Sequence, residues 1–379
     1  MAASYRGRVA RTRDDDACPG ALNVHHAADG ALARIRLPGG MITGAQLGSL
    51  ADAADRFGVG TLELTARGNV QVRGITDTAA VADAVAAAGL LPSPTHELVR
   101  NIVASPLSGR LGGRADVRPW VGELDHALQA DPALTDLPGR FLFSIDDGTA
   151  DVSGLAADVG VQVVDDDVAL LLAGRDTGVR LGAAEAVAAM LTVASRFAES
   201  RGTAWRIREL DDPAPLLAGF TPVCAPMPIP AAPRPPVGWI EQDDGRVALG
   251  AAVPLGVLSA RQAQFVAAIE APVVITPWRS LLVCYLDEGV ADTSLRVLAP
   301  LGLVFDTTSP WLDVTACVGS PGCERSRADV RAEATRVAES GSADGAVHYV
   351  GCERACGRPA TAEVWVATVD GYHPLPPPP

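Results

Sequence analysis

The stretch TLELTARGNVQVRGI, residues 61–75, decides the fold, because it recurs in altered form as PVVITPWRSLLVCYL, residues 272–286. In both copies, two runs of strand-forming residues flank a short segment that contains polar residues. This pattern predicts two antiparallel strands joined by a turn. Thr65 aligns with Thr276 across the two copies. The first inference is therefore an internal duplication.

The similarity extends outward from both stretches, over residues 31 to about 90 and residues about 246 to 303. Each copy predicts a strand, a helix, a hairpin and a second helix, and each closes on a Gly–Leu pair. A unit of this kind has a sheet face that it cannot bury alone, so two copies are expected to form one pseudo-symmetric α+β core. Repeats often build a site where they meet, although a repeat without a shared site remains an alternative.

A different kind of segment follows each copy. The first is followed by a predicted helix near 117–131, strands at 141–145 and 161–164, and a helix near 183–199. The second is followed by a predicted helix near 325–339 and strands near 346–350 and 362–368. Residues 222–236 are rich in proline and are typical of a linker, and the proline-rich end of the chain is expected to be disordered.

The composition is that of a globular protein of 379 residues, with 48% hydrophobic and 20% charged residues. All 31 basic residues are arginines, and the formal charge of −14 argues against nonspecific binding of nucleic acid. No run of eighteen apolar residues predicts a membrane span, and residues 1–16 lack the apolar region of a secretory signal. We therefore expect a cytoplasmic protein.

Four of the seven cysteines form two pairs, C-x5-C at Cys317 and Cys323 and C-x3-C at Cys352 and Cys356. Four thiolates are what a [4Fe–4S] cluster requires, and the glycines beside them allow close approach of the backbone. Structural zinc sites typically use C-x2-4-C spacing, which the first pair does not have. The pattern favours the cluster, with zinc or unliganded cysteines as alternatives.

Three further motifs carry arginines: LTARGNVQVRGI with Arg67, VRNIVASPLSG with Arg100, and GRFLFSIDDG with Arg140. A single arginine is usually a solvated surface charge. Three guanidinium groups held on loops could instead bind a ligand with several carboxylates.

Together these motifs resemble the nitrite and sulfite reductase superfamily over nearly the whole chain. The resemblance implies two ferredoxin-like half domains alternating with two cluster- and tetrapyrrole-binding α/β domains. It implies a [4Fe–4S] cluster on the four cysteines, with the position of Cys356 bridging to sirohaem in the reductases. It also implies tetrapyrrole contacts by Arg67 and Arg100. The implied domains are 17–92, half domain 1; 93–221, first reductase-type domain; 222–237, linker; 238–304, half domain 2; 305–371, cluster domain; and 372–379, disordered tail.

Within that superfamily the chain resembles the precorrin-3B synthase branch of cobalamin biosynthesis, through ACPGALNVHHAADGALARIRLPGG, ITPWRSLL and VHYVGCERACGRP. This resemblance implies oxygen-dependent hydroxylation of precorrin-3A with closure of a γ-lactone. The implied partners are precorrin-3A, dioxygen and an unidentified electron donor, with no nucleic acid and no membrane. A mononuclear non-haem iron is also implied. The sequence does not single out its ligands, and the candidate histidines are His25, His26, His96 and His348.

One departure from the reductases is informative. Where they carry substrate-protonating lysines, this chain has Arg140 and Leu142. Arginine is a poor proton donor because its pKa exceeds about 12. The exchange disfavours sulfite or nitrite reduction but not the holding of a carboxylated tetrapyrrole. A sirohaem-dependent reductase and a non-catalytic iron–sulfur electron carrier remain the alternative functions.

Overall fold

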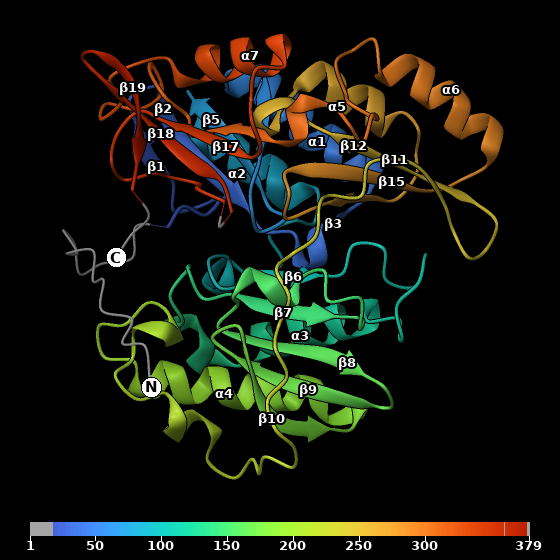
Figure 1. Cartoon of the computed structure of the whole chain (residues 1–379), viewed down its shortest axis with the longest axis vertical. Coiled ribbons are helices and arrows are strands. Elements are labelled where there is room, and N and C mark those ends of the chain that lie inside the picture. The colour runs from blue at the N-terminus through green and yellow to red at the C-terminus, as the bar shows by residue number, and fades with distance from the viewer. Residues whose placement is uncertain (1–17, 360, 377–379) are drawn as a thin grey trace. The chain divides into compact units, whose positions relative to one another are not determined.

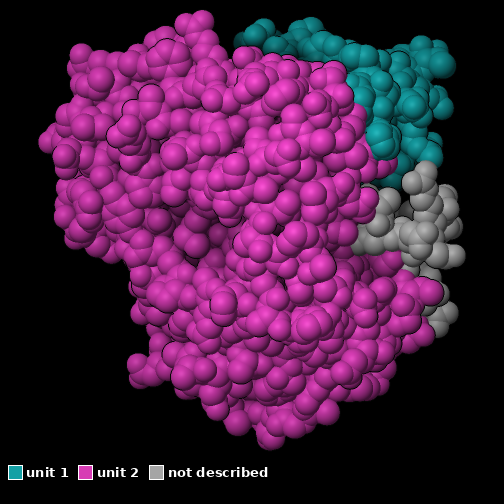
Figure 2. All heavy atoms as spheres, turned by 180° about the vertical axis from the view of Figure 1, so that it is seen from behind, with its two compact units in different colours: residues 1–17, 26–30, 306–379 teal, residues 18–25, 31–305 magenta. Residues whose placement is uncertain are grey.

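The computed structural model describes residues 18–359 and 361–376. It divides into two units (Figure 2). One unit contains residues 26–30 and the chain from Asp306 onward. The other contains residues 18–25 and 31–305, and therefore both copies of the repeat. Each unit is described by itself below.

The first copy folds as β2 (Gly30–Ile35), β3 (Met41–Ile42), α1 (Gly44–Phe57), β4 (Thr61–Leu64), β5 (Val70–Ile75) and α2 (Thr78–Ala87). A short strand, β1 (His25–Ala27), precedes it. The second copy follows β11 (Gly238–Glu241) and repeats the order as β12 (Val247–Ala252), β13 (Val257–Ser259), α5 (Ala260–Ala267), β14 (Val273–Ile275), β15 (Ser280–Leu286) and α6 (Glu288–Leu298). The predicted duplication is therefore present in the fold (Figure 1).

The same local chemistry starts the first helix of each copy. Thr43 accepts a hydrogen bond from the backbone N–H of Gln46, and the Gln46 side chain accepts one from the Thr43 N–H. Ser259 and Gln262 form the same reciprocal pair at the start of α5. Such capping boxes satisfy backbone donors that a helix leaves unpaired, and so they fix where the helix begins.

The two copies exchange a strand. β3 of the first copy pairs with β14 of the second, while β13 of the second pairs with β4 of the first. The strands consequently lie in the orders β2-β5-β4-β13 and β11-β12-β15-β14-β3. Apolar side chains of both copies, among them Leu62, Val72, Leu249 and Val283, belong to one continuous hydrophobic core. Neither copy buries its sheet without the other.

The segment after the first copy forms an α/β domain with its own core. It contains β6 (Ile102–Ala104), α3 (Arg118–Ala130), β7 (Phe143–Asp146), β8 (Val159–Val164), β9 (Asp167–Leu172), β10 (Arg175–Leu181) and α4 (Ala186–Ser200). The strands lie in the order β10-β9-β8-β7-β6, with β6, β7 and β8 parallel. Phe141, Phe143 and Phe197 are fully buried and their rings pack together in this core.

The segment after the second copy repeats this topology in the other unit. It contains β16 (Val314–Ala316), α7 (Val330–Ser340), β17 (Val347–Val350), β18 (Glu363–Thr368) and β19 (Gly371–Leu375). β16, β17 and β18 are parallel and β19 returns antiparallel, as β6, β7, β8 and β9 do. The fold is thus the predicted α+β arrangement, and its two α/β segments share one topology, in line with the two reductase-type domains that the resemblance implied.

Two expectations need correction. The helix predicted from residue 325 begins at Val330, because the backbone N–H groups of Ser326 and Arg327 bond to Cys323 and Gly351 before Asp329 caps the helix. The tail expected to be disordered from residue 372 instead begins within β19, where Pro374 is tolerated because the strand lies at the sheet edge. Residues 377–379 lie outside the described part. No helix among the described residues is long and apolar enough to cross a membrane.

Candidate functional site

The two cysteine pairs lie at the same edge of the parallel strands of the C-terminal unit. Cys317 directly follows β16, and Cys352 comes two residues after the neighbouring β17. The Cys317 N–H donates to the Tyr349 carbonyl at 2.9 Å, and the Gly351 N–H points to the Cys317 sulfur at 3.4 Å. Because parallel strands end at a common edge, this register brings the two pairs together.

The remaining two cysteines lie on the loops that leave this edge. The Arg327 N–H donates to the Gly351 carbonyl at 3.1 Å, which ties the loop of Cys323 to the loop of Cys352. Partial desolvation raises the pKa of the Cys356 thiol, and the other three thiols raise it further. Arg354 acts in the opposite direction. All four sulfurs therefore interact electrostatically at one place.

A single zinc ion and a four-iron cluster require different distances between the four cysteine sulfurs. A tetrahedral zinc with Zn–S bonds of about 2.3 Å holds its four sulfurs about 3.8 Å apart. Within the described residues, no three cysteine sulfurs lie within 4.8 Å of one another. A cubane cluster, whose four irons occupy separate corners, holds its thiolates more widely. Gly351 allows close wrapping, since a Cβ at this position would overlap the Ser326 side chain. The donor set of four thiolates is the one that a [4Fe–4S] cluster requires.

The four candidate histidines are not brought together. His348 is fully buried on β17, with Nδ1 2.9 Å from the Thr315 hydroxyl and Nε2 3.0 Å from the Cys356 carbonyl. His96 has both ring nitrogens engaged, by Ser93 and by the Asp131 carbonyl. His25 and His26 are exposed on β1. Among the described residues, no histidine belongs to a group of three potential metal ligands.

In the larger unit, β6 and β7 correspond to β16 and β17. The edge where β6 and β7 end carries carboxylates in place of cysteines. Asp146 accepts hydrogen bonds from the backbone N–H groups of residues 148, 150, 152 and 153, so it shapes its own loop. Asp151 accepts one from Ser105, which follows β6. Burial raises the pKa of Asp151 to about 7, against the effect of the Ser105 hydrogen bond and together with repulsion from Asp146 and Asp147. The sequence analysis did not single out this group.

The predicted arginines lie in the larger unit, and each has a partner. Arg67, on the loop between β4 and β5, donates to the carbonyls of Gly139 and Arg140 at 3.3 and 2.9 Å. Burial lowers its pKa to about 10, with further lowering by Arg206 and Arg34. Arg100 is buried and forms a bidentate pair with Asp125. Arg140 is exposed, and its guanidinium carbon lies 4.7 Å from the centre of the Trp205 ring.

Two buried asparagines, one in the motif of Arg67 and one in the motif of Arg100, join the arginine motifs. Asn69 and Asn101 are both fully buried, and the Asn69 amide donates to Asn101 Oδ1 at 3.2 Å. The Asn69 carbonyl oxygen accepts the Leu37 N–H, while the Asn101 amide donates to the Gly139 carbonyl. The signal was in the sequence, because each asparagine lies within two residues of a predicted arginine. The motifs of Arg67, Arg100 and Arg140 consequently meet through hydrogen bonds from the Asn69, Asn101 and Arg67 side chains.

The two copies of the repeat differ on the sheet face that points away from their shared core. In the first copy this face carries charged and polar side chains, whereas the matching positions of the second copy are small or apolar. The first set is Arg34, Arg36, Glu63, Gln71 and Arg73, and the matching set is Gly250, Ala252, Val274, Leu282 and Cys284. Leu107 packs on the apolar face. The charged face of the first copy is therefore the one suited to a polar ligand.

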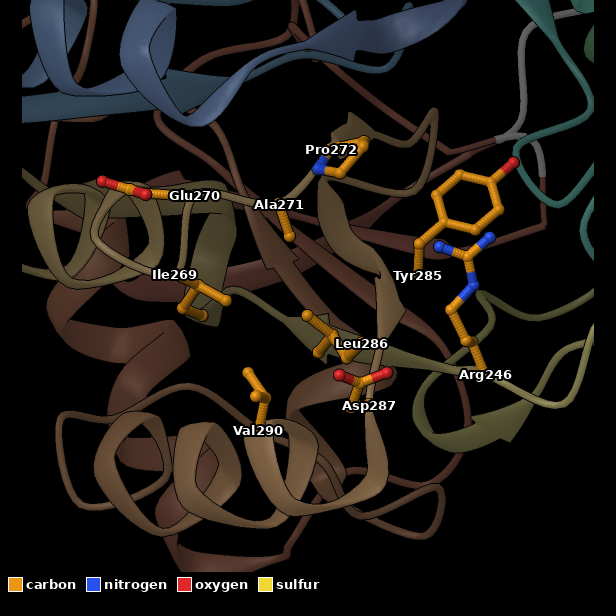
Figure 3. Close-up of a pocket in the computed structure, with 9 residues that line it drawn as sticks. All are labelled: Arg246, Ile269, Glu270, Ala271, Pro272, Tyr285, Leu286, Asp287 and Val290. Atoms are coloured by element: carbon orange, nitrogen blue, oxygen red, sulfur yellow. The ribbon is translucent and has the colours of Figure 1, made fainter.

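A separate surface pocket of about 400 Å³ lies in the second copy (Figure 3). Its lining includes Arg246 and Tyr285 at one side, residues 269–272 between α5 and β14, and Val290 of α6. The Arg246 guanidinium lies 4.7 Å from the centre of the Tyr285 ring. None of the predicted arginines lines this pocket.

Comparisons with known proteins agree with this architecture. Residues 25–88 match the nitrite/sulfite reductase ferredoxin-like half domain. The solved structure of the Mycobacterium tuberculosis NirA protein is similar, with a TM-score of 0.74 at 21% identity over 86% of this chain and 69% of that one. A ferredoxin–nitrite reductase of Synechococcus elongatus is 31% identical over 31% of this chain and 25% of its own length.

A precorrin-3B synthase of Sinorhizobium sp. is 30% identical over 97% of this chain and 83% of its own length. The match thus includes both copies of the repeat and both α/β segments. The chain belongs to the precorrin-3B synthase family, a group of oxidoreductases within the nitrite and sulfite reductase superfamily.

Proposed function

We propose that this chain is an oxygen-dependent hydroxylase of precorrin-3A that also closes the γ-lactone of the product. The observation that carries the proposal is the group of four cysteines at the common edge of β16 and β17 and on the loops that leave it, where the other three thiols raise the pKa of the Cys356 thiol. Family membership supplies the reaction, and the lysine-free sequence disfavours the multiple proton transfers of sulfite or nitrite reduction.

Cys317, Cys323, Cys352 and Cys356 are the proposed ligands of a [4Fe–4S] cluster. When bound, the cluster supplies single electrons from an unidentified donor for the reduction of dioxygen. The residues around it have separate tasks. The Gly351 N–H donates to the Cys317 sulfur, which stabilises its thiolate form, and His348 fixes the carbonyl of Cys356. A mononuclear non-haem iron is part of the family expectation, and we assign it no ligands.

The substrate is a tetrapyrrole with acetate and propionate arms, and Arg67, Arg100 and Arg140 are the proposed contacts for these arms. Arg140 is exposed, and its guanidinium is oriented by stacking on the Trp205 ring. Arg67 positions the loop that carries Arg140, because it donates hydrogen bonds to the carbonyls of residues 139 and 140. Arg100 would act on an arm while still paired with Asp125.

The first test is the visible spectrum of protein purified without oxygen, with iron and acid-labile sulfide counted. We expect a broad brown absorption without a Soret band, about four irons per chain, and conversion of added precorrin-3A in air when an electron donor is supplied. A Soret band from bound sirohaem would overturn the proposal in favour of a reductase. A colourless zinc protein would refute the cluster, and Cys356→Ser protein that folds and turns over at the wild-type rate would refute its role.

A further inference from the structure

Arg36 is a buried guanidinium with three of its five N–H donors unused. It lies directly after β2 on the charged face, and only 2% of its surface is exposed. Its Nη1 donates to the carbonyls of Pro19 and Arg34, at 2.9 and 3.3 Å. Its Nε and Nη2 have no hydrogen-bond partner, and both atoms are shielded from solvent. Buried donors without partners are rare and costly in native proteins.

The unused pair of nitrogens is the one that binds carboxylates elsewhere in this chain. Arg100 uses Nε and Nη2 to hold Asp125, at 2.6 and 2.8 Å. Arg118 uses the same pair on Asp116, at 2.8 and 2.7 Å. These parallel hydrogen bonds match the two oxygens of a carboxylate in geometry and charge. The free side of Arg36 is therefore shaped for a carboxylate.

The charges around Arg36 also favour an anion. Burial lowers the pKa of Arg36 to about 9, and the neighbouring Arg34 and Arg67 lower it further, against the effects of Cys18 and Glu97. The Glu97 carboxylate does not contact Arg36, since it accepts the backbone N–H groups of residues 21, 22 and 23. At neutral pH the guanidinium stays charged, and a further negative group would be stabilised beside it.

The fold does not require an arginine at this position. The matching residue of the second copy is Ala252, whose backbone N–H and carbonyl pair with Val304. Both copies nevertheless build the same strand, short helical turn and strand around that residue. The charge in the first copy is thus an addition to a framework that forms without it.

We propose that Arg36 binds one carboxylate arm of the tetrapyrrole through Nε and Nη2. The inference rests on the proposed function for the identity of the ligand, and it adds an anchor to Arg67, Arg100 and Arg140. Because Arg36 is enclosed, part of its cover has to move when the arm binds. Residues 18–23, which reach Arg36 through the Pro19 carbonyl, belong to that cover.

The test measures binding of uroporphyrin III, a stable tetrapyrrole with eight carboxylates, by fluorescence quenching. The variants are Arg36→Met, Arg36→Lys and, as the matched control, Arg246→Met. Arg246 is half-exposed, lies in the second copy and pairs with Asp244 at the surface. Lysine keeps the charge of Arg36 but cannot form two parallel hydrogen bonds.

We expect Arg36→Met to weaken binding by about ten- to a hundredfold, the range for a hydrogen-bonded charged group. Arg36→Lys should bind less tightly than the wild type, and Arg246→Met should bind equally well. The melting temperature of ligand-free Arg36→Met should stay the same or rise, because an unsatisfied buried charge is removed.

Unchanged binding by Arg36→Met, or by a folded Arg36→Lys protein if the methionine variant does not fold, would overturn the inference. A large fall in the ligand-free melting temperature of both variants would also overturn it, since Arg36 would then be a structural residue satisfied by a buried water. A different result would refute the proposed function without refuting the role of Arg36. If uroporphyrin binds in an Arg36-dependent way but precorrin-3A is not converted in air, the binding residue stands and the assigned reaction does not.

Discussion

Replacing Glu97 by glutamine should release the segment that covers Arg36. One carboxylate oxygen of Glu97 accepts the N–H groups of Ala21 at 2.6 Å and Leu22 at 3.0 Å, and the other accepts that of Asn23 at 3.0 Å. Glu97 is buried and lies more than seventy positions away in the sequence. Glutamine keeps one oxygen, which can still accept the N–H groups of Ala21 and Leu22, while its NH₂ group faces the N–H of Asn23; one bond is lost and the other two lose their charge.

A bond to a charged group contributes about 1.5 to 3 kcal/mol and a neutral one about 0.5 to 1.5 kcal/mol, so losing one bond and neutralising two costs about 3 kcal/mol. A change of about 1.4 kcal/mol corresponds to a factor of ten, and local opening of residues 21–23 should therefore increase on the order of a hundredfold. Hydrogen exchange followed by mass spectrometry on a peptide that contains these amides measures the change. Glu123→Gln, on the exposed face of α3, is the matched control. Unchanged exchange of residues 21–23 in folded Glu97→Gln protein would refute the reasoning.

Three further outcomes follow from the contacts. Cys317→Ala should lose cluster iron and sulfide while Cys284→Ala, which removes a buried apolar-face thiol, should keep both, as counted by chemical analysis. Because burial raises the pKa of Asp151 from 3.8 to about 7, the folded state binds its proton more tightly; stability should fall by up to about 4 kcal/mol as pH rises from 4 to above 7. Asp151→Asn should flatten that dependence in urea titrations at pH 5 and 8, and an unaltered slope would contradict it. His348→Phe removes both ring hydrogen bonds at similar volume and should speed iron loss to a chelator; wild-type release rates would show that the Cys356 carbonyl needs no such support.

The repeat was predictable because its signals are local. The hairpin of residues 61–75 and the cap formed by Thr43 and Gln46 depend on neighbours in sequence, and both recur in the second copy. The exchange of β3 and β13 was not predictable in the same way. These strands have two and three residues, and only pairing with the other copy makes them strands.

The cysteines of the candidate site were easier to predict from the sequence than the arginines. Cysteine spacing predicts candidate ligands, and the structure brings the loops of the two predicted pairs together at one strand edge. Arginines give no comparable signal, because the sequence does not show which guanidinium meets an internal carboxylate. Arg100 has Asp125 as its partner, twenty-five residues away, whereas the Nε and Nη2 of Arg36 have none. Only the folded contacts separate these two cases.

The strand exchange between the copies has a consequence for how the molecule can change over time. Two identical chains with this exchange would form a symmetric dimer, and every substitution would then appear on both faces at once. Covalent fusion removes that constraint, because each copy is encoded separately. The face with Arg36 and Arg73 could gain charge while the matching face, with Ala252 and Cys284, became apolar and was closed by Leu107. A single chain can in this way keep one ligand face where a symmetric pair would be obliged to keep two.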